Sequence, residues 1–435
     1  MPGVQLAERL GWGPRTRFTC EGAECGAGQF IPFGVPAIGR AERRAVDQTL
    51  ASRWIGTGPQ VARFEAEFAD AVGASHAVAV SSCTAALHLA LLTHGIGPGD
   101  EVITTPMSFV ATANAILYTG AEPVFADIDD TLNLDPAAVA KQVTSRTRAI
   151  LAVHFGGAPC DVSALGEIAK RHGLGLIEDA AHAIGSCFGD GRRVGSSGND
   201  TCFSFYPNKN ITTCEGGMVT TEDAARAEQL RSLRLHGLST DAWKRFGSRS
   251  LVRSRMLALG FKYNMTDLQA ALGRAQLTRL EAFTELRNRQ AHRYRAAFAD
   301  CQHFAALPAL ASGRSAYHLF TLWVRGLVRD EVIEELRRAG VGASIHYHPI
   351  HLQPYYRERD PSLAGRFPAA ERAGAETLSL PVGPSVRPAD QERIIRAVRE
   401  IDCRHRVARL HSARRVRAAP SARDASVREL SEPGP

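Results

Sequence analysis

Residues 149–182 have the sequence AILAVHFGGAPCDVSALGEIAKRHGLGLIEDAAH, which contains one complete unit of strand, helix and strand. An apolar run opens the unit at 149–155, and a second apolar run follows at 174–179. Between them, Asp161 is placed to cap a helix that ends at Gly173, because Asp is a favoured N-cap and Gly commonly follows a helix end. Two strands joined by one helix are expected to lie parallel in the same sheet.

The same alternation of strand and helix continues towards the N-terminus. Strands are predicted at 76–81, 101–105 and 122–128, with helical stretches between them, and Asp135 followed by Pro136 starts a further helix. Repeated segments of this kind predict an α/β fold in which helices cover both faces of a mostly parallel sheet.

The pattern changes after residue 221. Residues 266–298 form a long amphipathic helical stretch, with apolar residues at intervals of three and four. A strand at 319–324 and helices at 330–339 and 387–400 follow, which indicates a smaller C-terminal α+β domain. The predicted organisation is an N-terminal extension (1–29), a large domain (30–265), a small domain (266–403) and a tail (404–435).

The composition of the 435-residue chain, 44% hydrophobic and 22% charged, is typical of a soluble globular protein. No run of about 18 apolar residues is present, so we expect no membrane span. The first thirty residues lack the pattern of a signal peptide. The nine Cys are scattered, and the pair Cys20 and Cys25 has no second pair nearby, so neither a disulfide framework nor a metal site is expected. We expect a cytoplasmic protein.

The net charge of +7 is concentrated in the tail. Residues 404–435 contain eight Arg and three acidic residues, so the rest of the chain carries only +2. The tail is rich in Arg, Ala, Ser and Pro and poor in large apolar residues, which predicts disorder. It also lacks the interleaved aromatic residues of nucleic-acid binders. A solvated appendage is the favoured interpretation, and no nucleic-acid partner is expected.

In open α/β sheets, ligands bind at the carboxyl ends of the strands. Two of the predicted strand ends have no charged residue but carry side chains that could contact a ligand. Residues 81–86, SSCTAA, join a strand to a helix, where free amides and the hydroxyl of Thr84 suit an anion. An ordinary Ser or Thr helix cap explains the same residues. Phe109, which follows the strand at 101–105, is suited to cover a planar ligand, although core packing is the commoner role of an aromatic residue.

Two further strand ends carry charged residues. Glu178 and Asp179 end a wholly apolar strand, and buried carboxylates are rare without a partner. Asp179 is suited to pair with a cationic ring nitrogen, with His182 nearby. A role as a helix cap is the alternative. Lys209 follows an apolar strand, and although most Lys are solvated, this one and Ser204 lie among aromatic residues. An anion cradle, a ring cover, an Asp and a lysine amine together fit pyridoxal 5′-phosphate (PLP).

The chain resembles the DegT/DnrJ/EryC1/StrS family of PLP-dependent aminotransferases from Phe30 to Val398, about 85% of its length. The stretches that carry the resemblance include WIGTGPQVARFEAEFA, AVSSCTAALHLAL, GDEVITTPMSFVATANAI, IEDAAHAIGS, FSFYPNKNITTCEGGMV and GFKYNMTDLQAALGRAQL. The family implies PLP fold type I, the aspartate aminotransferase-like architecture. GFKYNMTD and KNITTCEGG are most similar to the branch that aminates UDP-4-keto sugars. Within it, the chain most resembles UDP-4-amino-4-deoxy-L-arabinose aminotransferases, and the enzymes that form UDP-4-amino-4,6-dideoxy-N-acetyl-altrosamine are a near alternative.

The resemblance implies a role for each matching residue. Lys209 corresponds to the lysine that carries the cofactor, and Asp179 to the acid that pairs with the pyridine nitrogen. Phe109 corresponds to the aromatic residue that stacks on the ring. Further cofactor contacts are implied for Thr84, the backbone of Ala85, His182, Ser204 and, from the neighbouring subunit, Asn264. A homodimer with shared active sites follows. Cys83 departs from the family pattern, because many relatives have Gly there.

The implied reaction is a transamination in which L-glutamate is the amino donor and a nucleotide-linked keto sugar is the acceptor. The segment HYHPIHLQPYY is similar to one near the sugar in relatives, so His346, Tyr347 and His348 are candidate substrate contacts. A His-rich interface strand is an equally open interpretation. Lys262 and Trp54 are candidates for the nucleotide.

Two other functions stay open at the level of the sequence. One is an aminotransferase for a keto-cyclitol or another antibiotic precursor, with glutamine as the donor. The other is a non-catalytic regulator with a PLP-enzyme fold, against which the intact Lys209, Asp179 and Ser204 argue.

Overall fold

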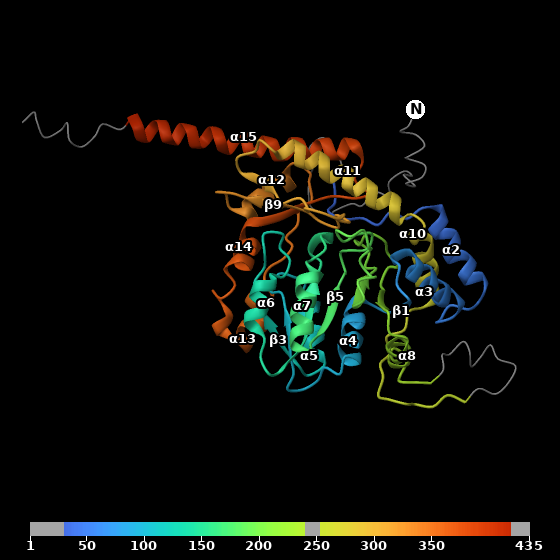
Figure 1. The fold of residues 1–435 in the computed structure, drawn as a ribbon. Coiled ribbons are helices and arrows are strands. Elements are labelled where there is room, and N and C mark those ends of the chain that lie inside the picture. The colour runs from blue at the N-terminus through green and yellow to red at the C-terminus, as the bar shows by residue number, and fades with distance from the viewer. Residues whose placement is uncertain (1–29, 240–252, 419–435) are drawn as a thin grey trace, which may run out of the picture.

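The computed structural model describes residues 30–239 and 253–418 (Figure 1). The predicted N-terminal extension, with Cys20 and Cys25, lies outside the described residues, as does the part of the predicted tail from residue 419 onward.

The described residues contain a seven-stranded sheet in the order β1-β7-β6-β5-β4-β2-β3. Its strands are β1 (His76–Val80), β2 (Glu101–Thr104), β3 (Glu122–Phe125), β4 (Thr147–Val153), β5 (Gly175–Asp179), β6 (Asp200–Ser204) and β7 (Gly217–Thr221). Only β7 runs antiparallel to its neighbours β1 and β6; the other pairs are parallel. The predicted strands from residue 76 to 179 all form, with ends that differ by one to three residues.

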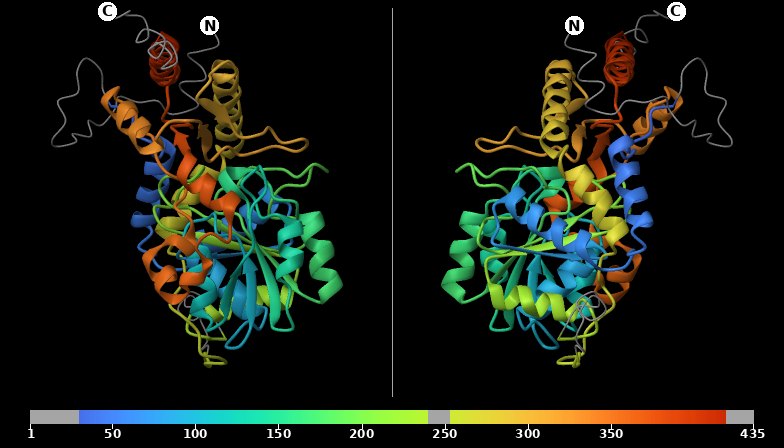
Figure 2. Two further views of the ribbon diagram at one scale, coloured as in Figure 1. Left: turned by 90° about the vertical axis from the view of Figure 1, so that its left-hand side faces the viewer. Right: turned by 90° about the vertical axis from the view of Figure 1, so that its right-hand side faces the viewer.

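Helices cover both faces of this sheet, as predicted (Figure 2). Successive side chains of β1 point to opposite faces of the sheet. Ala77 and Ala79 therefore pack into the core cluster on one face, and Val78 and Val80 into the core cluster on the other. One face is covered by α4 (Cys83–Thr93), α5 (Ala111–Tyr118) and α8 (Ala224–Leu233). The other is covered by α3 (Pro59–Val72), α6 (Pro136–Gln142), α7 (Val162–His172) and α10 (Asp267–Leu277).

The outer edge of β1 is closed by side chains and by a distant segment. The amide of Ala79 donates to Glu65 Oε1 at 2.9 Å, and Arg234 Nη1 donates to the carbonyl of Ala79 at 2.7 Å. Glu65 and Arg234 also form a largely buried ion pair. Beyond them, the amide of Ser81 donates to the carbonyl of Tyr263 at 2.7 Å. These contacts satisfy backbone groups that an open strand edge would expose.

The predicted helical stretch 266–298 is two helices, α10 and α11 (Leu280–Phe298). α10 packs against α3 and α2 (Arg40–Ala51), whereas the far end of α11 belongs to a second core. The change from one core to the other therefore lies within α11, between Leu286, which packs in the first core, and Ala291, which packs in the second.

The second core surrounds a three-stranded antiparallel sheet in the order β10-β9-β8 in the described part of the chain. Its elements are β8 (Phe304–Ala306), β9 (Phe320–Val324), α12 (Arg329–Arg338), β10 (Thr377–Leu380) and α15 (Pro388–Ala418). Ile31 joins this core from the start of the described chain. The smaller α+β unit predicted after residue 221 is present in this form.

The segment between α12 and β10 packs onto the large sheet. It contains α13 (Pro354–Arg359) and α14 (Pro368–Glu376). Tyr356 donates from its hydroxyl to Asn114 Oδ1 at 2.7 Å, and the Asp127 carboxylate accepts from the first amides of α14 at 3.0 Å. A negative side chain at a helix N-terminus is favourable. These contacts fix the residues just before α13 against the edge of the large sheet.

The prediction that the chain becomes disordered at residue 404 is wrong for residues 404–418, because α15 continues to Ala418 and projects beyond the body (Figure 1). Residues 404–418 are mostly Arg, Ala, Val and Leu, with no Gly or Pro, and such residues permit a helix. Glu335 of α12 contacts both Arg404 and His405, which ties the first turn of this extension to the body. None of the described helices is long and apolar enough to span a membrane.

We expect a variant that ends after residue 403 to keep the steady-state kinetics of the transamination that the family resemblance implies. The pairs that it loses with Glu335 are solvent-accessible, and such pairs contribute about 0–1 kcal/mol to stability. Urea unfolding should therefore show a loss below about 1 kcal/mol. A large loss of activity would show that the outer part of α15 supports the site.

Candidate active site

The carboxyl ends of the parallel strands lie along one edge of the sheet, and the predicted chemical groups lie at this edge. Residues 81–86 follow β1, Phe109 follows β2, Asp179 ends β5, and Lys209 follows β6. Because β7 runs in the opposite direction, the connection that contains Lys209 turns back at the same edge. Parallel strands thus bring together groups that are far apart in the sequence, such as Thr84 and Lys209, which are separated by 125 positions.

Asp179 is a buried carboxylate with two donors. It is 5% exposed, its Oδ2 accepts from Thr112 Oγ1 at 2.8 Å, and its Oδ1 accepts from the amide of Ala181 at 3.1 Å. Since Thr112 donates to Asp179, Thr112 must accept from Ser108 Oγ, which lies 2.8 Å away. Burial raises the pKa of Asp179, and the hydrogen bonds from Thr112 and Ala181 oppose this shift. A nearby cation would favour the ionised form further.

Lys209 lies in the connection between β6 and β7, where its amide donates to the carbonyl of Tyr206 at 2.9 Å. Burial lowers the pKa of its amine to about 8, while the charge of nearby Asp179 opposes the shift. A substantial fraction of this amine is therefore neutral near physiological pH, in contrast to an ordinary lysine. A neutral amine is the form that attacks a carbonyl carbon.

The predicted anion cradle at the start of α4 forms, and the alternative of a helix cap is also present. Ser82 is the N-cap, and its Oγ accepts from the amide of Ala85 at 3.1 Å. The Ala85 amide, a predicted phosphate contact, is thus already used, whereas the first amides of a helix have no intrahelical acceptor. A Cβ atom on Gly217 would lie 2.5 Å from the Ser82 carbonyl, so only glycine lets β7 pass so close to the cradle. Ser204 is buried at the end of β6.

His182 is a neutral imidazole with a defined tautomer. The amide of Gly156 donates to its Nδ1 at 3.3 Å, so the proton is on Nε2, which lies 3.0 Å from the Tyr347 hydroxyl. The His182 ring stacks on His318 with ring centres 4.4 Å apart. Burial lowers the pKa of His182 well below its usual value, and Lys209 adds to this shift. The tautomer leaves the Tyr347 O–H free to donate to another group.

Two of the three predicted substrate residues in the HYH segment reach this site. His346 is 8% exposed, and its Nδ1 has no hydrogen-bond partner among the described residues. Burial, with Lys209 adding to it, lowers the pKa of His346 to about 3. The ring centre of Tyr347 lies 6.1 Å from that of Phe109, which is 58% exposed. His348 is exposed, and none of these three residues lies in a strand.

Asn264 lies at the end of β1 of its own chain, where its backbone pairs with that of Val80. Its Nδ2 donates to Thr57 Oγ1 at 2.6 Å, and Trp54 Nε1 donates to the Thr57 carbonyl at 3.1 Å. The predicted residues Trp54 and Asn264 therefore gather around Thr57, a short distance from the cradle. Lys262, two residues earlier, is exposed to solvent.

Sequence reasoning missed two residues that contact predicted site residues, and a third that contacts one of these two. Thr112 holds Asp179, His318 stacks on His182, and Asn210 Oδ1 lies 3.3 Å from His318 Nδ1. No local pattern marks Thr112 or His318, because their partners lie 67 and 136 residues away in the sequence. Asn210 is buried and follows Lys209 directly, so its place next to the predicted cofactor lysine was the signal available in the sequence.

The described residues fit PLP. The amine of Lys209 and the carboxylate of Asp179 lie close enough for each charge to shift the pKa of the other. Gly217 leaves room for the cradle at the start of α4, and the buried Nδ1 of His346 lacks a partner that a ligand would supply. Lys209 would hold the aldehyde carbon, Asp179 the ring nitrogen, and the α4 N-terminus with Ser204 the phosphate.

Comparison with known proteins supports PLP as the cofactor. Residues 36–399 match the model of the DegT/DnrJ/EryC1/StrS aminotransferase family. The spore coat polysaccharide biosynthesis protein SpsC of Bacillus subtilis is 47% identical over 378 residues, which are 86% of this chain and 97% of SpsC. Helicobacter pylori PseC, an aminotransferase of pseudoaminic acid biosynthesis, is 29% identical with a TM-score of 0.80, over 86% of this chain and 99% of PseC. The PLP form of Spr1654 from Streptococcus pneumoniae is 30% identical with a TM-score of 0.79, over 86% and 99% of the two chains.

We expect PLP to become attached to the apoprotein through Lys209 with a rate that rises as the pH passes through about 8. Folding lowers the pKa of this amine, so the reactive neutral form appears at a lower pH than for a free lysine, whose pKa is about 10.4. Borohydride reduction followed by mass spectrometry would locate and quantify the attached cofactor. Lys209→Ala should fold, bind PLP without a covalent bond and give no labelled peptide; a label on this variant would identify another lysine as the carrier.

Proposed function

The chain belongs to the DegT/DnrJ/EryC1/StrS aminotransferase family and is a PLP-dependent transaminase, and we propose that it transfers an amino group from L-glutamate to a nucleotide-linked keto sugar. The proposed acceptor is a UDP-4-keto sugar, as the similarity of GFKYNMTD and KNITTCEGG to that branch suggests. Relatives include SpsC, a polysaccharide biosynthesis protein, and PseC, an aminotransferase of pseudoaminic acid biosynthesis, which supports a sugar as the acceptor.

One observation carries the proposed chemistry: a buried lysine amine with a lowered pKa and a buried carboxylate lie together at one edge of the sheet. The carboxylate of Asp179 is suited to hold a proton on a ring nitrogen, and the amine of Lys209 is suited to move a proton at a carbon atom above the ring. These two roles are separated in space, because Asp179 comes from β5 and Lys209 from the connection after β6.

When bound, PLP supplies an electron sink that stabilises the negative charge left when the α-proton of the amino donor is removed. Lys209 takes this proton as a neutral amine and returns it to a neighbouring carbon as an ammonium group. Its pKa near 8 suits both steps, since both the neutral and the protonated form are populated near neutral pH. Asp179, held by Thr112 and Ala181, keeps its geometry throughout.

We assign the acceptor side of the site to the HYH segment and to the edge of β1. His346 and Tyr347 offer a free imidazole nitrogen and a free hydroxyl proton next to the cofactor residues, which suits sugar hydroxyl groups. Exposed His348 would lie further out. Lys262 and Trp54, on either side of Asn264 and Thr57, would supply a cation for a diphosphate and a ring for a base.

We expect L-glutamate to convert the visible absorbance of bound PLP to that of the pyridoxamine form, and a UDP-4-keto sugar to restore it. The two half-reactions are followed separately, so donor and acceptor are identified independently. A matched panel would contain L-glutamine as the alternative donor, and dTDP-keto sugars and keto-cyclitols as alternative acceptors. Restoration by a keto-cyclitol but by no nucleotide sugar would contradict the proposed acceptor.

We also propose a homodimer in which Asn264 contacts the phosphate bound to the partner subunit. Exposed apolar side chains at Met256, Leu257 and Leu259, in the segment before Asn264, favour an interface there. Asn264→Asp would place a negative charge near the phosphate and weaken binding of PLP.

Mixed dimers of Asn264→Asp and Lys209→Ala test this arrangement. If Asn264 acts across the interface, one site of a mixed dimer has both defects and the other has neither. Random pairing makes about half of the dimers mixed, so about a quarter of all sites should be active. If Asn264 serves the site of its own chain, every site in a mixed dimer has one defect, and mixtures proven by mass spectrometry to contain heterodimers stay inactive.

A further inference from the structure

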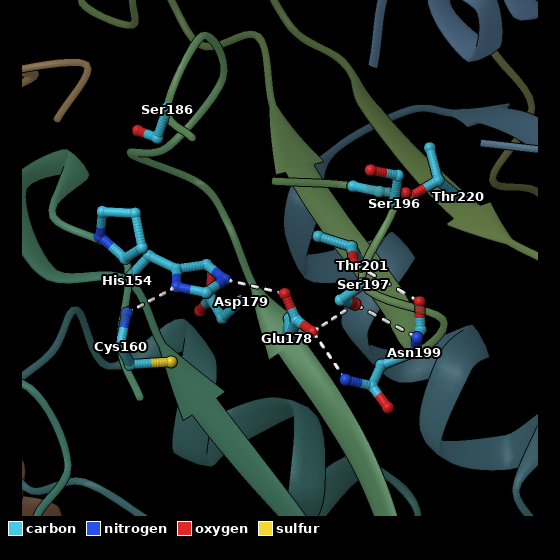
Figure 3. Close-up of polar contacts among 12 residues, drawn as sticks. His154, Cys160, Glu178, Asp179, Ser186, Ser196, Ser197, Asn199, Thr201 and Thr220 are labelled. Atoms are coloured by element: carbon cyan, nitrogen blue, oxygen red, sulfur yellow. Dashed lines mark hydrogen bonds and ion pairs between the residues drawn. The ribbon is translucent and has the colours of Figure 1, made fainter. Parts of the chain in front are cut away.

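A second carboxylate, Glu178, lies next to Asp179 in the sequence and belongs to a buried polar network of its own (Figure 3). Its Oε2 lies 2.9 Å from His154 Nε2, and both side chains are fully buried. Its Oε1 accepts from Ser197 Oγ at 2.5 Å and from Asn199 Nδ2 at 2.7 Å. Burial raises the pKa of Glu178, but these three hydrogen bonds outweigh it and lower the pKa below its usual value.

The hydrogen bonds of His154 fix its tautomer. The amide of Cys160 donates to His154 Nδ1 at 3.1 Å, so Nδ1 carries no proton and Nε2–H donates to Glu178. Both ring nitrogens are thereby used, and the orientation of the ring is determined from two sides (Figure 3). Neither His154 nor Glu178 has access to a ligand, because each is completely covered by protein.

His154 is also joined to the cofactor residues through the backbone. It directly follows β4, whose last residue pairs with Asp179, and its amide donates to the Asp179 carbonyl at 3.1 Å. The next residues form the turn Phe155–Gly157, in which the amide of Gly156 donates to His182 Nδ1 at 3.3 Å. One short segment thus contacts both Asp179 and His182.

We propose that His154 and Glu178 are positioning residues for the cofactor: their buried contact fixes the end of β4 against the end of β5 and so sets the positions of Asp179 and His182. Displacement of the His154 ring would move the backbone that holds the Asp179 carbonyl and the amide that holds the His182 tautomer. Small displacements of groups that face a reacting centre have large effects on binding and rate. The proposal rests on the cofactor roles proposed for Asp179 and His182.

The described residues contain another His–carboxylate pair, largely buried and also contacted by Arg226, that provides a control. His94 Nε2 lies 3.2 Å from Asp200 Oδ2, with the same ring nitrogen facing the carboxylate. Asp200 is the first residue of β6, so this pair lies at the opposite edge of the sheet from Lys209. If the substitutions only lower the stability of the fold, the His154 and His94 variants should behave alike. If His154 positions the cofactor residues, only the His154 variant should bind PLP more weakly.

The test compares His154→Asn, His154→Gln and His94→Asn. The amide of Gln reaches the position of Nε2 and can still donate to Glu178, whereas that of Asn is too short. For His154→Asn we expect the Kd of the apoprotein for PLP to rise about tenfold, as for other residues that orient binding groups, and the pH midpoint of the bound cofactor's absorbance to shift. His154→Gln and His94→Asn should keep the Kd within about twofold of the parent and the same midpoint.

Each result supports or overturns the proposal. An unchanged Kd and absorbance midpoint in His154→Asn, or an equal change in His94→Asn, would overturn it. If His154→Asn does not fold, Glu178→Asp, which shortens the carboxylate by one methylene, should show the same two changes, and their absence would again overturn it. Asp179→Asn is measured in parallel: if it too leaves both readouts unchanged, the role proposed for Asp179 itself is wrong.

Discussion

The burial of the Asp179 carboxylate is the constraint on which the rest of the site depends. A carboxylate removed from water is stable only if hydrogen bonds or a cation replace its hydration. Thr112 and Ala181 supply two hydrogen bonds, and the cation is left to Lys209 or to a bound ring nitrogen. The same low-dielectric surroundings make the interaction with a cofactor stronger than it would be in water.

Burial also decides the protonation state of the groups around Asp179. It lowers the pKa of Lys209 to about 8 and that of His346 to about 3, and it keeps His182 neutral. The site therefore contains few permanent positive charges, although it is rich in nitrogen atoms. An anionic cofactor with a cationic ring would complete its charge balance, and a lysine with a mobile proton would remain for catalysis.

The small α+β unit completes the site rather than merely adjoining it. Tyr347 reaches His182, and Phe155 and Leu319 share a core cluster with Ile350 and Tyr356. The first amides of α14 bind to Asp127 of the large sheet. Packing on either side of the HYH segment thus holds Tyr347 at a fixed distance from His182, as the roles proposed for these residues require.

The sequence alone determined the strand and helix alternation up to Asp179, because apolar periodicity and caps such as Asp135 and Asp161 are local. It also predicted that Lys209, Asp179 and the start of α4 lie at one edge of the sheet, since parallel strands must end at one edge. The length of α15 was misjudged because helix propensity and disorder share the same Arg and Ala composition. Burial of Glu178 required a partner, but the sequence did not identify which residue it is. Only the tertiary structure selects His154 among the His residues, because the two residues lie 24 positions apart in the sequence. A contact at this separation depends on strand order and register, which no local pattern encodes.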